Sequence, residues 1–116
     1  MSEGARTPEE LEALFEDAFV LRDRGALVPL FEAQALLVAE GVTGEVRGSR
    51  EIALSASDLW SRNLTYVADP RRVVQADDIA LIFAPLGLSV TRRGADRAWR
   101  YAIALLTMQQ KIKEDS

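Results

Sequence analysis

The sequence predicts an α+β fold in which N-terminal helices pack on an antiparallel sheet. The clearest observation is a pair of apolar segments, residues 79–90 and 99–108, separated by the polar stretch 91–97, which is the pattern of a long hairpin. The second observation is helical periodicity before residue 25. A chain of 116 residues is long enough for one core. We therefore expect a single domain over residues 1–116, with its core over about 7–108 and a frayed tail at 109–116.

Composition excludes several kinds of chemistry. The chain has no cysteine and no histidine, which rules out disulfides, thiolate ligands, imidazole bases and Ser-His-Asp hydrolysis. We therefore expect no metal site and no cofactor. An isoelectric point near 4.8 argues against nucleic acid as a partner. Residues 46–100 do carry nine arginines and only six acidic residues, but these arginines are not clustered on one predicted helix.

Nothing in the sequence predicts an association with membranes. The apolar segment 79–90 is shorter than a bilayer span and contains Pro85 and Gly87. The polar N-terminus leads directly into a helix start and lacks the apolar region of a signal peptide. We expect a cytoplasmic location and no membrane partner.

The first helix begins at a capping signal. Thr7 can accept a hydrogen bond from a free backbone N–H, Pro8 suits the first helical position, and Glu10 completes a capping box. The helix should run to about Arg24 and stop at Gly25. Its acidic positions, Glu12 among them, are expected to face solvent. The apolar stripe that defines the buried face consists of Leu11, Leu14, Phe15, Ala18 and Leu21, widened by Phe19 and Val20.

The next three elements are shorter. A second helix is expected over residues 26–31, followed by a first strand over 35–39. Ser49 can cap a third helix that runs to about Asn63. One face of that helix carries Ile52, Ala56, Leu59 and Trp60.

The remainder of the chain reads as strands. Extended structure begins at 65–67, and residues 73–76 form a strand that turns at Asp77-Asp78 into the segment 79–90. Pro85 cannot donate to a strand ladder, which predicts a bulge or an edge position at that point.

The last strand is apolar on both alternating faces. Such a strand needs a cover on each side, because a sheet covered by helices on one face only should alternate apolar and polar residues. The simplest second cover is a symmetric copy, so we expect a homodimer through the sheet face. The two predicted faces are Trp99, Tyr101, Ile103 and Leu105 on one side, and Ala102, Ala104, Leu106 and Met108 on the other.

Four local sequences carry a family resemblance: LFEAQA at 30–35, VRGSREI at 46–52, VQADDIAL at 74–81 and GADRAWRY at 94–101. Their order and spacing resemble the NTF2-like superfamily, specifically its small bacterial SnoaL-like and DUF4440-type members. The resemblance implies a cystatin-like, ketosteroid-isomerase-like fold: a curved sheet wrapped into a cone by helices, with a pocket at the open end and often a dimer through the sheet. Since one fold serves many activities, the fold alone does not settle the function.

The resemblance also implies a test for catalysis. In isomerase-like and cyclase-like members, an aspartate in or just after the first strand acts as base, and that position falls at Ala39. Glu40 is the candidate general base, although it would point to the opposite face if the strand continued. The tyrosine expected on the first helix is missing, since Phe15 and Phe19 occupy its neighbourhood. We expect the pocket to be lined by Phe15, Phe19, Leu37, Ala39, Trp60 and Tyr66.

Three functions stay open on the sequence. The first is a non-catalytic module that binds a small apolar or amphipathic molecule. The second is an isomerase, cyclase or hydrolase that uses a pocket carboxylate such as Glu40. The third is a protein-interaction domain that works through the apolar sheet face.

Overall fold

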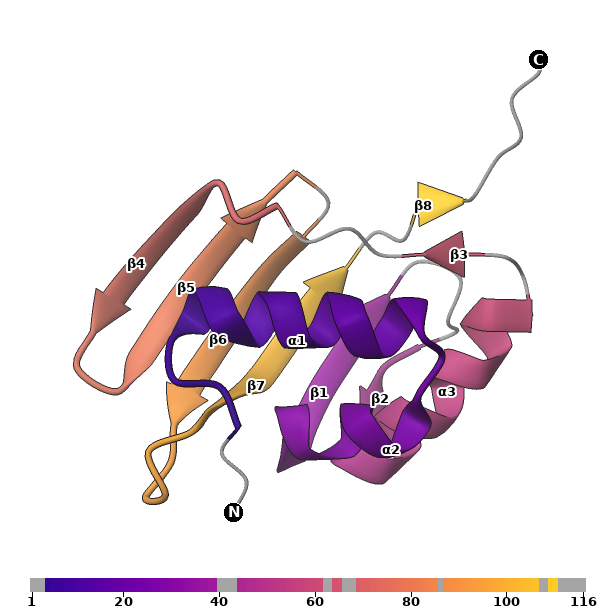
Figure 1. The fold of residues 1–116 in the computed structure, drawn as a ribbon, viewed down its shortest axis with the longest axis horizontal. Coiled ribbons are helices and arrows are strands. Elements are labelled where there is room, and N and C mark those ends of the chain that lie inside the picture. Colours follow the sequence, from indigo (N-terminus) through magenta and orange to yellow (C-terminus); the bar gives the residue numbers. More distant parts are fainter. Residues whose placement is uncertain are drawn as a thin grey trace.

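The computed structural model describes residues 4–39, 44–61, 64–65, 69–85, 87–106 and 109–110. Figure 1 shows helices lying across one face of a six-stranded sheet. The described helices leave the opposite face uncovered, where apolar side chains stay partly exposed. The α+β arrangement of N-terminal helices on a sheet is thus confirmed.

Helix α1 (Pro8–Val20) begins as predicted and ends early. The Thr7 side chain accepts from the Glu10 backbone N–H at 3.0 Å, and the Glu10 carboxylate accepts from the Arg6 N–H at 2.7 Å. The predicted end near Arg24 is wrong by about one turn, because Arg22 adopts a left-handed φ of 57°. The Asp23 N–H then closes back onto the Ala18 carbonyl, which is a helix-ending motif.

The second helix begins two residues earlier than predicted and is shorter than the expected 26–31. Helix α2 (Arg24–Leu27), capped by the Asp23 side chain, runs into the 3₁₀ turn η1 (Val28–Leu30). Strand β1 (Phe31–Ala39) therefore begins four residues earlier than the predicted 35–39.

Helix α3 (Ser49–Ser61) is built on a glycine. Ser49 is the first residue of the helix, so the prediction of a Ser49 cap is wrong and Gly48 holds the position before it. Gly48 has a φ of 99°, donates to the Ala35 carbonyl at 2.8 Å, and accepts from the Ile52 N–H at 2.9 Å. A side chain at position 48 would be strained in this conformation.

The main sheet is mixed, with strand order β2-β1-β7-β6-β5-β4. The expectation of a purely antiparallel sheet is wrong at one place, because β1 pairs with β7 in parallel. A long connection that includes α3 separates these two strands, and parallel pairing requires such a crossover. The other strands of this sheet are β2 (Val46–Arg47), β4 (Arg72–Ala76), β5 (Ile79–Ala84), β6 (Gly87–Arg93) and β7 (Trp99–Leu106).

Two short strands form a second sheet. β3 (Leu64–Thr65) pairs with β8 (Gln109–Gln110), so two residues of the tail that we expected to fray are paired.

The predicted long strand 79–90 is two strands. Pro85 lies in the turn between β5 and β6, rather than at a bulge or an edge, since a residue without an N–H interrupts the ladder there. The Asp77-Asp78 turn between β4 and β5 forms as predicted, with Asp77 at a left-handed φ of 54°.

A β-bulge changes the two faces of β7. Val90 of β6 pairs with Ile103 of β7, but the next residue, Thr91, pairs with Tyr101, so Ala102 is an extra residue without a partner in the β6 register. This extra residue shifts the in–out alternation of the β7 side chains by one position. The predicted faces are therefore wrong. Tyr101, Ala104 and Leu106 are buried on the helix side, whereas Ile103 and Leu105 are exposed.

Candidate functional site

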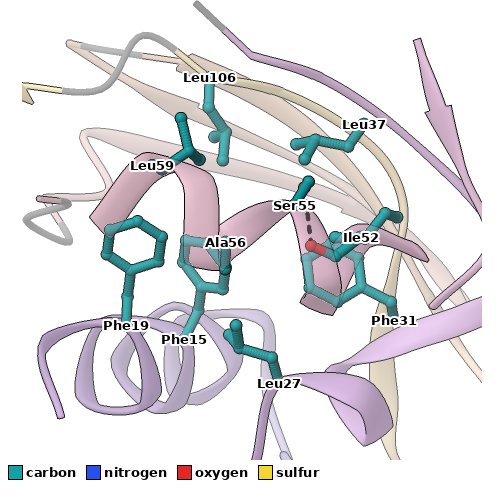
Figure 2. Close-up of a pocket in the computed structure, with 10 residues that line it drawn as sticks. All are labelled: Phe15, Phe19, Leu27, Phe31, Leu37, Ile52, Ser55, Ala56, Leu59 and Leu106. Carbon is teal, nitrogen blue, oxygen red and sulfur yellow. Dashed lines mark hydrogen bonds between the residues drawn. The ribbon is translucent and has the colours of Figure 1, made fainter. Parts of the chain in front are cut away.

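A small cavity lies between the helices and the sheet, as Figure 2 shows. Its volume is about 10 Å³, room for roughly one water molecule. The lining is apolar except for Ser55, whose hydroxyl already donates to the Ile52 carbonyl at 2.8 Å. The lining residues are Phe15, Phe19, Leu27, Phe31, Leu37, Ile52, Ser55, Ala56, Leu59 and Leu106.

The structure places the predicted pocket residues in three groups. Phe15, Phe19 and Leu37 line the cavity. Ala39 and Trp60 are buried in the core and do not belong to the described lining. Glu40, the candidate base, and Tyr66 lie outside the residues that the structure describes.

The sequence also held a signal for lining residues that the prediction left out. Ile52, Ala56 and Leu59 share one face of α3 with Trp60, and that face borders the cavity. Phe31 was placed at the end of a helix, and its role as the first residue of β1 was missed for that reason.

Trp60 carries an unusual polar group. Its indole Nε1–H is buried and has no hydrogen-bond partner among the residues that the structure describes, and the residue is 8% exposed. Its ring contacts that of Phe19, with centroids 5.5 Å apart. Trp60 stands one helical turn beyond Ala56, which lines the cavity, whereas Trp60 itself is not part of the described lining. A buried donor without an acceptor costs free energy, typically about 1–3 kcal/mol.

A buried carboxylate–phenol pair lies behind the cavity wall. Tyr101 Oη donates to Glu12 at 2.5 Å, and the two residues are 2% and 1% exposed. The expectation that Glu12 faces solvent is therefore wrong. Glu12 falls between Pro8 and Phe15 on the buried stripe of α1, a spacing that could have revealed it. The rings of Phe15 and Phe31 pack on Tyr101 at 5.6 and 5.2 Å, and neither member of the pair lines the cavity.

The opposite face of the sheet forms a second candidate site, here called the outer sheet face. The strand register aligns its side chains in cross-strand rows, for example Val74, Leu81, Val90 and Ile103. Seven large apolar side chains on this face are 36–42% exposed: Val38, Val74, Ile79, Leu81, Phe83, Ile103 and Leu105.

One end of the outer sheet face is polar. Arg92 lies opposite Ile79 and binds the Glu32 carboxylate through two nitrogens, at 2.8 and 3.0 Å. The hydrogen bond and the negative charge of Glu32 raise the pKa of Arg92. Arg92 therefore shares a cross-strand row with Ile79, and the ion pair makes this end of the outer sheet face polar.

The described residues contain no group of three or more acidic side chains suited to a metal ion. None of their helices is both long and apolar enough to cross a bilayer.

Comparison with solved structures identifies the architecture. A ketosteroid isomerase-like protein from Erwinia carotovora atroseptica aligns at a TM-score of 0.73, with 18% identity, over 93% of this chain and 98% of that chain. An NTF2-like protein with a cystatin-like fold from Novosphingobium aromaticivorans aligns at 0.65, with 15% identity, over 90% and 80%. The chain has the NTF2-like, cystatin-like fold.

A third neighbour is described as a candidate calcium/calmodulin-dependent protein kinase type II association domain, from Thiobacillus denitrificans. It aligns at a TM-score of 0.74, with 16% identity, over 94% of this chain and all of that chain. The sequence itself matches no family model and no curated protein. The structural similarity therefore establishes the fold, and the activity must be inferred from the geometry of the candidate sites.

Proposed function

We propose that this NTF2-like domain is a non-catalytic association module that forms a homodimer through its outer sheet face. The observation that carries the proposal is the set of seven large apolar side chains that remain 36–42% exposed on one uncovered sheet surface. Continuous apolar patches of this kind mark interaction sites on soluble proteins.

The size of the face suits a dimer. Five strands spaced about 4.8 Å apart, with roughly 20 Å of strand length, give about 500 Å² per protomer and about 1,000 Å² for a pair. That value reaches the lower limit of specific interfaces. Burying an apolar side chain yields about 1.5–3 kcal/mol, so the exposed two-fifths of seven side chains yield roughly 4–8 kcal/mol per protomer.

Two protomers together would gain about 8–17 kcal/mol, against an association cost of about 4–15 kcal/mol. A second copy is the occupant that we favour, because a flat apolar sheet face is complementary to itself when two sheets stack about 10 Å apart. The neighbour described as an association domain, which aligns over its full length, is consistent with this role.

The oligomeric state tests the proposal. Sedimentation equilibrium at micromolar concentration should give a dimer, and Ile103→Lys should give a monomer because it places a charge in the middle of the apolar rows. The matched control is Val20→Lys, since Val20 is apolar and 56% exposed at the end of α1, away from the sheet. A wild-type monomer, or equal effects of both variants, would contradict the proposed interface.

A second candidate function is binding of a small apolar or amphipathic molecule in the cone. The apolar lining and the unpartnered Trp60 Nε1–H favour it, since a bound acceptor atom would satisfy the indole. The volume of about 10 Å³ weighs against a preformed site, so side chains such as Phe19 would have to move. Mass spectrometry of an organic extract of the native protein tests this function: a stoichiometric small molecule supports it, and an empty extract counts against it.

The enzyme alternative depends on Glu40, because no carboxylate lines the described cavity. Glu40→Gln should abolish turnover of a substrate if this alternative holds, and unchanged turnover would exclude the assignment. On the sequence motifs, we also propose the SnoaL-like and DUF4440-type subgroup and a cytoplasmic location.

A further inference from the structure

A second cavity opens at the surface between α2 and α3, on the helical layer of the molecule. Its volume is about 480 Å³, against about 10 Å³ for the cavity inside the cone. Small-molecule sites usually measure about 300–1,000 Å³, so this groove has room for a ligand without rearrangement. Arg24, Gly25 and Val28 form one wall, and Arg50, Glu51, Ala53 and Leu54 form the other.

The groove has an apolar part. Ala53 is buried, Val28 is half-buried, and Leu54 is 52% exposed although it is a large aliphatic side chain on a helix. Gly25 contributes no side chain, which keeps the α2 wall low. A short hydrocarbon or aromatic body could therefore bury the exposed area of Leu54.

The groove also has two unpaired cations. Within the part of the chain that the structure describes, neither Arg24 nor Arg50 forms an ion pair, so both guanidinium groups are available to an anion. They share this with Arg6, Arg22, Arg47, Arg72 and Arg97, none of which lines the groove. The distinguishing feature of Arg24 and Arg50 is their place on opposite walls of one groove, in a chain whose formal charge is −4.

The acidic groups nearby do not neutralise both arginines. Asp23 caps α2, where its carboxylate accepts from the Ala26 N–H at 3.1 Å. Glu51 is the one carboxylate in the lining and has no ion pair among the described residues, so the lining carries two positive charges and one negative charge.

We propose that this groove binds a free, soluble amphipathic carboxylate. The carboxylate head would bind the guanidinium groups of Arg24 and Arg50, which suit planar oxyanions, and the apolar body would lie on Val28 and Leu54. This site lies on the helical layer, apart from the outer sheet face, so it is independent of the proposed dimer.

Titration with hexanoate, followed by amide NMR shifts, tests the site. The expected result is saturable shifts at the start of α3 and in α2, with hexanamide and inorganic phosphate binding more weakly, because each lacks one half of the ligand. The double variant Arg24→Gln/Arg50→Gln should weaken hexanoate binding about tenfold or more, because it removes both cations that would hold the carboxylate.

Arg97→Gln is the matched control, because Arg97 is exposed, is not in an ion pair among the described residues, and lies in the β6–β7 turn. It should leave hexanoate binding unchanged. Equal affinity for hexanamide, equal loss in the control, binding only to anionic lipid vesicles, or no saturable shift would overturn the proposal. Sedimentation of the double variant keeps the two proposals separable, since its oligomeric state should match that of the wild type.

Discussion

The buried pair of Glu12 and Tyr101 offers a quantitative test of the packing. Tyr101→Phe removes the phenol that donates to Glu12 at 2.5 Å and changes little else in shape. Both residues are at most 2% exposed, so water cannot readily replace the lost donor. Leaving a buried polar group without one partner costs about 1–3 kcal/mol, and we expect about 2 kcal/mol.

That loss converts into a measurable shift. At about 2.1 cal/mol/K of unfolding entropy per residue, 116 residues give about 0.24 kcal/mol/K, so about 2 kcal/mol lowers Tm by roughly 8 °C. Glu12→Leu should cost a similar amount, because it leaves the Tyr101 hydroxyl without this acceptor. The double variant should lie closer to the wild type than the sum of the two losses, since both polar groups are then replaced by apolar ones.

Thermal and urea unfolding, followed by circular dichroism at one fixed protein concentration, provide the four free energies of the double-mutant cycle. The fixed concentration matters because self-association would add to apparent stability. A Tyr101→Phe variant within about 0.5 kcal/mol of the wild type, or strictly additive losses in the double variant, would refute the view that the two side chains depend on each other.

Three further outcomes follow from local geometry. Thr7→Ala should cost about 1 kcal/mol in urea unfolding, because the Glu10 N–H loses its cap, and Thr7→Ser should restore most of it. Gly87→Ala should lower the free energy of unfolding by about 1–3 kcal/mol, because the new Cβ would stand 2.6 Å from the Leu105 carbonyl oxygen. An unchanged unfolding midpoint would show that β6 and β7 can move apart here without loss of stability. Hydrogen bonds from Arg100 are the main cause of a lowered pKa at Asp96. The stability that the ionised Asp96 contributes is therefore present above its ordinary pKa of 3.8 and is lost as pH falls below that value. Asp96→Asn should therefore flatten the acid limb of a stability–pH curve, and an unaltered limb would assign the acid sensitivity to other carboxylates.

Local signals carried much of the fold. The Thr7–Pro8 start of α1 and the Asp77-Asp78 turn were predictable because each depends on neighbouring residues that satisfy backbone groups. The NTF2-like fold was predictable from the order of such signals along the chain. Gly48 shows the limit: its left-handed φ follows from a hydrogen bond to Ala35, a contact that lies thirteen positions away in the sequence.

The errors share a physical cause, which is that pairing between distant segments decided the outcome. The bulge in β7 offset the alternation at Ala102, and a one-residue offset exchanges the two faces of a strand. Glu12 is buried because a tyrosine 89 residues further along supplies its hydrogen bond. Of the candidate site, Phe15, Phe19 and Leu37 could be placed from periodicity, whereas the closeness of the packing around them depends on the helices and the sheet together.

The position of β7 between β1 and β6 has a consequence for how the chain reaches its native state. Leu37 of β1 pairs with Ala104 of β7, 67 positions later in the sequence. Strand β1 therefore cannot pair with β7 until that later part of the chain has been made and has folded next to it. Closing so long a loop is entropically costly, and folds dominated by distant pairings acquire their structure slowly. While it waits, β1 presents an apolar edge that other chains can pair with, so translation and refolding are the periods in which this protein is most exposed to aggregation.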